Sequence, residues 1–165
     1  MENFKLYRGE ELTIEQCRTL LSHPKNGPAE NHPSPEEVLT GFRKYSDTAP
    51  KFFILYSDSL VAHAMAGECY KNVMTVDDFW ADDAVLNLKF YRSTRRTPGY
   101  EIFLRCLDWG IRKGFDEVTQ PLIVGKQGKR AWDRWVDSGL LIPVSADKRF
   151  HCKIPKTLPE LLDLS

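Results

Sequence analysis

The segment LNLKFY (residues 86–91) alternates apolar and polar side chains, a pattern typical of a strand with one buried face. It leads into the basic loop RSTRRTPG (92–99) and then into YEIFLRCLDWGIRKG (100–114), where apolar residues recur at helical spacing. The final glycine of that stretch is typical of a helix end. The sequence therefore predicts a strand, a basic turn and a helix in direct succession.

The flanking sequence predicts the other elements of a mixed α/β domain over residues 1–165. Besides the strand at 84–90, strands are expected at 4–7, 52–56, 60–68, 118–124, 140–144 and 150–154. Besides the helix from 100, helices are expected at 14–21, from SPEE (34–37) to 45, and after GKQGKR (125–130), with a helical turn at 158–164. Acidic sequence between 75 and 83 is expected to be irregular. The predicted order is β-α-α-β-β-β-α-β-α-β-β.

Composition limits the class of protein. Of the 165 residues, 42% are hydrophobic and 28% are charged, which predicts a globular domain with a sizeable core. Lys and Arg number 23, as do Asp and Glu, so no net field draws the chain to nucleic acid or acidic lipid. No apolar run approaches the ~18 residues of a membrane helix. The four cysteines are scattered and the N-terminus does not read as a signal peptide, so a cytoplasmic location is expected.

The predicted order of elements resembles the GNAT superfamily of acyl-CoA-dependent N-acyltransferases. Its characteristic segment is a strand, a Q/R-x-x-G-x-G/A loop and a helix, which matches residues 86–115 in order. Further along, Ala131, Trp135 and the pair Gly139-Leu140 stand where family members often have alanine, tyrosine and Gly-Phe. The resemblance implies a mixed sheet of about six to seven strands with about four helices. It also implies acetyl transfer from acetyl-CoA, or another acyl-CoA, to an amine.

The basic loop favours a phosphate site on its own chemistry. A helix N-terminus offers unpaired N–H groups and partial positive charge, which suit the pyrophosphate of coenzyme A, and arginines add to this. The expected acyl-CoA site consists of Leu88, Phe90, Arg92, Arg95, Arg96, Thr97, Gly99 and Tyr100. The alternative is a solvated basic loop that only caps a surface helix.

The loop can be aligned with the family motif in two ways. If Gly99 is the last small residue of the motif, Thr97 replaces the central glycine. If Gly99 is the central glycine, Glu101 occupies the last small position, where its side chain would crowd the phosphates. In both alignments Pro98 removes one N–H donor.

The implied reaction needs three groups. By the resemblance, backbone N–H groups at a bulge in the fourth strand, placed here near 88–91, polarise the thioester carbonyl. Base candidates are Glu68, at the end of a strand rich in small residues, and Asp83, next to Asp82 at the start of the fourth strand. The alternative for both carboxylates is a solvated surface position.

The proton donor is less well defined by the sequence. Trp135 stands at the position of the usual tyrosine, and an indole N–H is not a useful acid at neutral pH. Core packing is the favoured interpretation of Trp135, and Ser138, Tyr91 and Tyr100 are the substitutes nearest in sequence.

Two further features bear on the site. His63 lies among Ala and Met in a predicted strand, which favours a core histidine, and no histidine has a partner at metal-ligand spacing, so no metal site is expected. The loop 23–33, with three prolines, is either a specificity element over the acceptor site or a plain connector.

Three functions remain open from the sequence. The first is an N-acyltransferase acting on a small-molecule or protein amine. The second is a GNAT-like binding or structural module without catalysis, of the kind found in virions. The third is nucleic-acid binding through two basic clusters, Lys89–Arg96 and Lys126–Arg134, against which the zero net charge weighs. The last hairpin (140–156) is an edge through which a homodimer could form.

Overall fold

The structure is a computed structural model that describes residues 3–82, 96–121 and 124–164. The strands are β1 (Phe4–Arg8), β2 (Lys51–Tyr56), β3 (Ser59–Tyr70), β4 (Val73–Ala81), β5 (Glu117–Thr119), β6 (Ile142–Pro143) and β7 (His151–Lys153). The α-helices are α1 (Ile14–Leu21), α2 (Pro35–Lys44), α4 (Pro98–Arg112) and α5 (Lys126–Asp137). Three 3-10 turns, η1 (Gly9–Glu11), η2 (Pro24–Asn26) and η3 (Ala29–Asn31), lie in the first third of the chain. The predicted mixed α/β class is confirmed.

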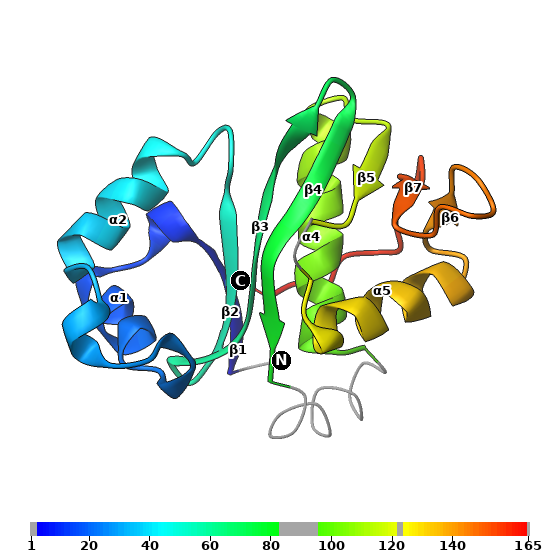
Figure 1. The fold of residues 1–165 in the computed structure, drawn as a ribbon. Helices are drawn as coiled ribbons and strands as arrows, with labels where there is room; N and C mark the ends of the chain where they lie inside the picture. The colour runs from blue at the N-terminus through cyan, green and yellow to red at the C-terminus, as the bar shows by residue number, and fades with distance from the viewer. Residues whose placement is uncertain (1–2, 83–95, 122–123, 165) are drawn as a thin grey trace.

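One sheet collects all seven described strands in the order β1-β2-β3-β4-β5-β7-β6. Only β4 and β5 are parallel neighbours, and the other pairs are antiparallel. Helices α1 and α2 cover one face of the sheet, and α4 and α5 lie on the opposite side (Figure 1). Parallel neighbours need a crossover connection, and helix α4 lies in the connection between β4 and β5.

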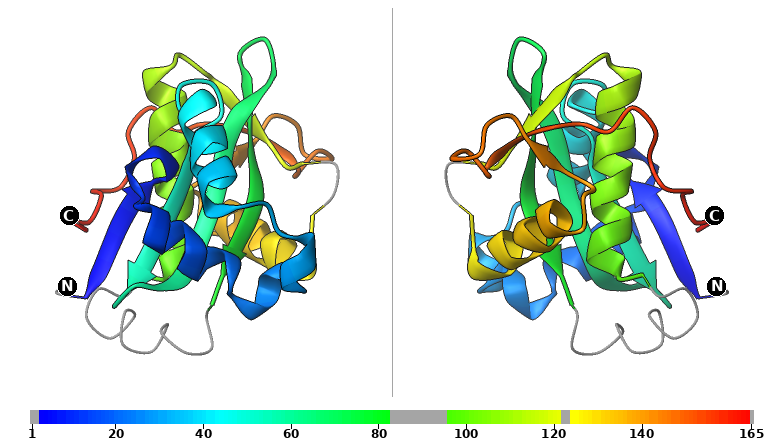
Figure 2. Two further views of the ribbon diagram at one scale, coloured as in Figure 1. Left: turned by 90° about the vertical axis from the view of Figure 1, so that its left-hand side faces the viewer. Right: turned by 90° about the vertical axis from the view of Figure 1, so that its right-hand side faces the viewer.

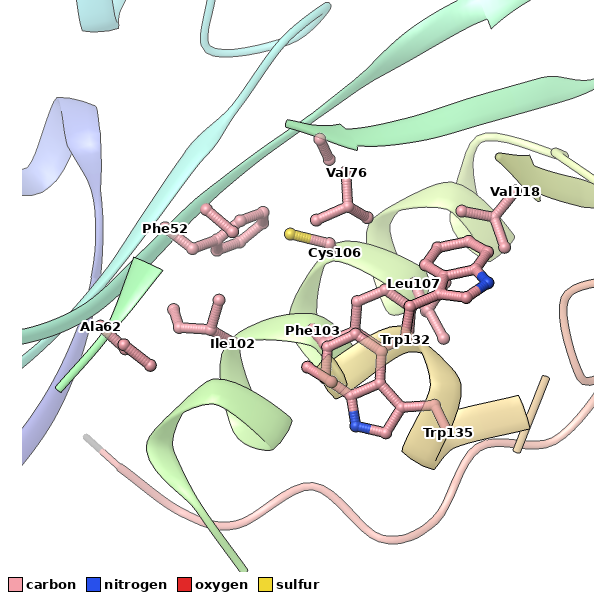
Figure 3. Close-up of a cluster of buried hydrophobic side chains, with 14 of the residues drawn as sticks. Phe52, Ala62, Val76, Ile102, Phe103, Cys106, Leu107, Val118, Trp132 and Trp135 are labelled. Carbon is pink, nitrogen blue, oxygen red and sulfur yellow. The ribbon is translucent and has the colours of Figure 1, made fainter. Parts of the chain in front are cut away.

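Local sequence signals explain why helix α4 forms where it does. Thr97 is the N-cap and accepts a hydrogen bond from the Tyr100 N–H, and Pro98 occupies the first turn, where its missing N–H costs nothing. The apolar residues Ile102, Phe103, Cys106 and Leu107 recur at helical spacing and are buried against the sheet (Figure 3). This packing fixes α4 beneath the central strands, with its N-terminus at one end of β4.

The fourth strand corrects one prediction. Residues 75–83 were expected to be irregular, yet β4 runs from Val73 to Ala81. The pair Asp77-Asp78 hides the strand because it breaks the apolar alternation, and Asp78 adopts a positive φ of 52° at an irregularity in the ladder with β3. The strand predicted at 84–90 lies entirely outside the described residues.

The C-terminal tail corrects a second prediction. Residues 158–164 form no helical turn, because their carbonyl groups bind other elements. The Leu6 N–H donates to the Leu164 carbonyl at 2.8 Å, and Arg105 donates to the Leu162 carbonyl. The tail therefore runs in extended form past α4 to the outer edge of β1 (Figure 2). Within the described ranges, no helix combines the length and apolarity needed to cross a bilayer.

Candidate functional site

A gap opens where β4 and β5 separate. In the described part of the chain their pairing covers only Val73–Thr75 and Glu117–Thr119, and the chain then leaves β5 through Gln120-Pro121. The opening holds a pocket of about 420 Å³, here named the interstrand pocket. Its walls come from β4 (Val76, Asp78, Phe79, Trp80), from Phe103 of α4, from residues 120, 121, 124 and 125, and from α5 (Lys126, Gln127, Gly128, Trp132, Trp135). A pocket of this size is within the usual range for a small-molecule site.

The strand β4 carries a bulge on the wall of this pocket. His63 of β3 is opposite Trp80, and Met65 is opposite Asp77, so β3 advances by two residues where β4 advances by three. The extra residue lies at Asp78-Phe79, and Asp78 takes up the irregularity with its positive φ. A bulge leaves backbone groups outside the ladder and redirects them, here beside the pocket.

His63 forms a polar cluster with the bulge. Its side chain is 2% exposed, lies between the rings of Trp80 and Phe53, and places Nδ1 3.6 Å from Oδ2 of Asp78. That same Oδ2 lies 2.5 Å from Nζ of Lys51. Burial and the nearby cations Lys51 and Lys25 lower the pKa of His63 to about 3, so the imidazole is neutral at physiological pH.

The charge on Asp78 is stabilised by the same neighbours. Burial by itself opposes ionisation of this carboxyl group, but Lys51 outweighs it and holds the pKa of Asp78 below its usual value. A neutral imidazole can accept a hydrogen bond from a polar group that lies beside the carboxylate. The sequence interpretation of His63 as a buried strand residue is confirmed, but its link to Asp78 depends on the β3–β4 register, which the sequence did not reveal.

Aromatic packing closes the base of the pocket. The Trp135 ring stacks on Phe103 with centroids 3.8 Å apart and meets Phe79 edge-on at 5.7 Å. Figure 3 shows Trp132 and Trp135 of α5 meeting α4 in this cluster. Trp135 is 8% exposed and belongs to the main hydrophobic core, so the expectation that it is a packing residue is confirmed.

Three solved structures illustrate what this architecture is similar to. Neither a protein-family model nor a curated protein sequence matches the chain. An acetyltransferase from Trypanosoma brucei matches with a TM-score of 0.56 and 12% identity, over 83% of this chain and 92% of that one. The PaiA N-acetyltransferase from Thermoplasma acidophilum, in complex with coenzyme A, matches at 0.54 and 13%, over 92% and 98%. The glucosamine-6-phosphate N-acetyltransferase from Arabidopsis thaliana matches at 0.54 and 16%, over 79% and 88%.

The chain has the GNAT fold. Identities this low show the fold and leave the substrate to be argued from the site itself. The bulge expected near 88–91 lies outside the described residues, and the bulge that the structure describes is in β4, at Asp78-Phe79.

The Arg96 side chain contacts other residues of the protein. Its guanidinium forms an ion pair with the fully buried Glu101, donates to the Glu160 carbonyl at 2.5 Å and lies 5.1 Å over the Tyr100 ring. Burial raises the pKa of Glu101, and the guanidinium groups of Arg96 and Arg105 oppose that rise. The side chain expected to hold phosphate thus neutralises a buried carboxylate and fastens the C-terminal tail.

Little open space lies beside the N-terminus of α4. Pro98 has no N–H, and the N–H groups of Tyr100 and Glu101 both donate to Thr97. A Cβ on Gly99 would lie 3.0 Å from the Phe79 ring and 3.2 Å from Cβ of Ala81, so glycine allows the close approach of α4 to β4. Between this turn and α5, only about 10 Å³ is open, and its lining includes Thr97, Gly99, Tyr100 and the cation Arg134.

Gln127 bridges the end of β4 to α5. Its Nε2 donates to the Ala81 carbonyl at 2.5 Å, and the Ala81 N–H donates to its Oε1 at 3.3 Å. The side-chain amide thus occupies both polar groups of one β4 residue at the edge of the interstrand pocket. It satisfies backbone groups that lost their ladder partner when the strands separated.

The remaining predicted site residues are dispersed. Glu68 is exposed and pairs with Met74, near the end of β4 that still contacts β5, and Ser138 is exposed at the end of α5, where its Oγ donates to the Trp135 carbonyl. Neither lines the interstrand pocket. The others lie outside the described residues: Asp83, Leu88, Phe90, Arg92 and Arg95. Within the described ranges, no three His, Cys, Asp or Glu side chains gather as metal ligands.

Proposed function

We propose that the protein is an acyl-CoA-dependent N-acyltransferase that works at the interstrand pocket. The observation that carries this proposal is the bulged strand β4 on the wall of a pocket of about 420 Å³, in a chain with the GNAT fold. The pocket combines a largely apolar lining with backbone groups outside the ladder, which suits a slender chain bearing amides and a thioester. A solved neighbour with this fold was determined in complex with coenzyme A.

The residues present fit the acyl arm of such a donor better than its phosphates. Little space is open at the N-terminus of α4, and Arg96 is bound to Glu101. Arg134 is the cation that lines that small space among the described residues. Lys126 lines the mouth of the interstrand pocket from the first turn of α5. We therefore assign the phosphate contacts to α5 side chains, in place of the arginine-rich loop as a whole.

The chemistry follows from the two groups at the bulge. Acyl-CoA supplies an activated acyl group: the C–N bond to the amine forms, the C–S bond breaks, and an entering ammonium group loses two protons, one of which ends on the sulfur. Backbone N–H groups released at Asp78-Phe79 stabilise negative charge on the carbonyl oxygen. The other proton passes to solvent, while the neutral His63, with Asp78 beside it, can accept a hydrogen bond that orients the amine.

Binding of acetyl-CoA is the first test. Acetyl-CoA at about 100 times its Kd is expected to stabilise the folded protein by ~2.7 kcal/mol, which raises the melting temperature by about 5–10 °C in a chain of this size. The measurement is a thermal unfolding scan with acetyl-CoA and, as controls, with ATP and sulfate. If millimolar acetyl-CoA leaves the melting temperature unchanged, the protein is a non-catalytic module with this fold.

Charge reversal at Arg134 tests the phosphate contact. Arg134→Glu is expected to weaken coenzyme A binding about 10- to 100-fold, because a charge-assisted hydrogen bond to phosphate is lost and a like charge is introduced. Calorimetric titration with coenzyme A gives the Kd. Arg130→Glu is the matched control, since Arg130 is exposed on the same helix and does not line the cleft. Equal affinity in both variants would place the phosphates elsewhere.

A further inference from the structure

A second cavity lies on the other face of the sheet, beneath α1 and α2. It has a volume of about 170 Å³ and is here named the lysine pocket. Its apolar wall includes Leu20, Val38, Phe42 and Leu60, and its polar wall includes Lys25, Lys51 and His63. One water occupies ~30 Å³ in the liquid, so the cavity has room for one small molecule.

Lys25 brings a positive charge to the edge of this cavity, where the residue is partly exposed to solvent. Its ammonium group contacts Oδ1 of Asn26 at 3.2 Å and lies 5.6 Å over the Trp80 ring. Within the described residues no carboxylate lies at ion-pair distance from it, whereas Lys51 is already paired with Asp78. Partial burial lowers the pKa of Lys25, and the charge of Asp78 opposes that shift. The ammonium group of Lys25 is therefore available to bind an anionic group that enters the cavity.

His63 gives the same cavity an unsatisfied polar group. The side chain is 2% exposed and lines the lysine pocket, and neither ring nitrogen forms a hydrogen bond of normal geometry within the described residues. A buried polar group without a hydrogen-bond partner destabilises the folded state, so an occupant that hydrogen-bonds to it would be favoured. The ring therefore marks where a polar atom of the occupant would lie.

Asp78 connects the two cavities. It lines the interstrand pocket, and its Oδ2 lies 3.6 Å from Nδ1 of His63, which lines the lysine pocket. An ammonium group held by Asp78 and His63 would lie at the bulge of β4, beside the expected position of the thioester. The chain thus offers, in order, a cation, an apolar wall and an anion that faces the acyl site.

We propose that the lysine pocket binds the acceptor, and that the acceptor is a free α-amino acid with an apolar side chain. This inference rests on the proposed acyltransfer. The carboxylate of the amino acid binds Lys25, its side chain packs among Leu20, Val38 and Phe42, and its ammonium group binds Asp78 and His63. The loop 23–33, which was either a specificity element or a connector, supplies Lys25 and is thereby a specificity element.

Donor-free binding of amino acids tests the inference separately from acyl transfer. Thermal unfolding and calorimetric titration are run with L-leucine, L-methionine and L-phenylalanine, and with leucinamide and 4-methylpentanoate, which lack the carboxylate and the amine of leucine. At least one of the three amino acids is expected to bind. If leucine binds, leucinamide and 4-methylpentanoate are each expected to bind at least tenfold more weakly than leucine. Release of free thiol from acetyl-CoA is then measured with the amino acid that binds.

A lysine variant locates the binding. Lys25→Met is expected to weaken amino-acid binding at least tenfold and to leave acetyl-CoA binding unchanged. Lys71→Met, at an exposed turn between β3 and β4, is the matched control and should change neither. If acetyl-CoA binds but no amino acid does, or if Lys25→Met has no effect, the inference is overturned while the proposed function stands. If an amino acid binds and acetyl-CoA does not, the proposed function fails and the acceptor assignment fails with it.

Discussion

Replacement of Arg96 by methionine is expected to lower the free energy of unfolding by about 3–5 kcal/mol. The substitution leaves Glu101 as a fully buried carboxylate without its nearest counter-ion, and the loss of one partner from a buried pair has this typical cost. For a chain of this length the melting temperature should fall on the order of 10 °C. Urea unfolding at pH 8 and pH 5 measures the effect, which should be smaller at pH 5, where Glu101 is more readily protonated.

Two controls make the Arg96 prediction specific. The double variant Arg96→Met with Glu101→Leu removes both charges and should recover most of the lost stability. Arg18→Met breaks the exposed pair with Glu15 and should cost less than about 1 kcal/mol. If Arg96→Met were as mild as Arg18→Met, the side chain would be free to serve a ligand, as the sequence first predicted.

Acidification is expected to destabilise the protein through His63. In the folded state the pKa of His63 is about 3, whereas the unfolded chain takes up this proton near pH 6.5. Between these values the unfolded state binds more protons, so the free energy of unfolding falls as the pH drops below 6.5. From pH 7 to pH 4.5, this one group should remove roughly 2–3 kcal/mol.

A variant isolates the His63 contribution from other titrating groups. His63→Phe keeps a ring between Trp80 and Phe53 but cannot take up a proton, so its loss of stability between pH 7 and pH 4.5 should be smaller by that amount. Urea unfolding of the parent protein and of the variant at the two pH values gives the comparison. An unchanged pH dependence in His63→Phe would show that the imidazole is not held neutral by its surroundings.

The helices and most strands could be predicted because their signals are local. Thr13, Ser34 and Thr97 are N-caps that each act within one turn, and the apolar stripe of α4 has a period that only a helix satisfies. The resemblance to the GNAT superfamily followed from the order of those elements, and the fold is confirmed. Trp135 is predictable as a packing residue because its indole is apolar and is not a useful acid at neutral pH.

The site could not be predicted because it depends on register. Asp77-Asp78 interrupts the apolar alternation of β4, so the sequence predicts irregular structure where the structure has a strand. The contact of His63 with Asp78 arises only when β3 and β4 pair with an extra residue in β4. Likewise, nothing local shows that Arg96 meets Glu101 and a carbonyl 64 positions away.

The C-terminal tail has a consequence for the order of events on the ribosome. The outer edge of β1 and the surroundings of Glu101 are completed by residues 160–164, which emerge long after β1 and α4 have been synthesised. Until then, a nascent chain presents a bare strand edge that can pair with other chains. Slowed translation of the codons for residues 150–164 should therefore increase aggregation, and chaperones should be needed most in that interval.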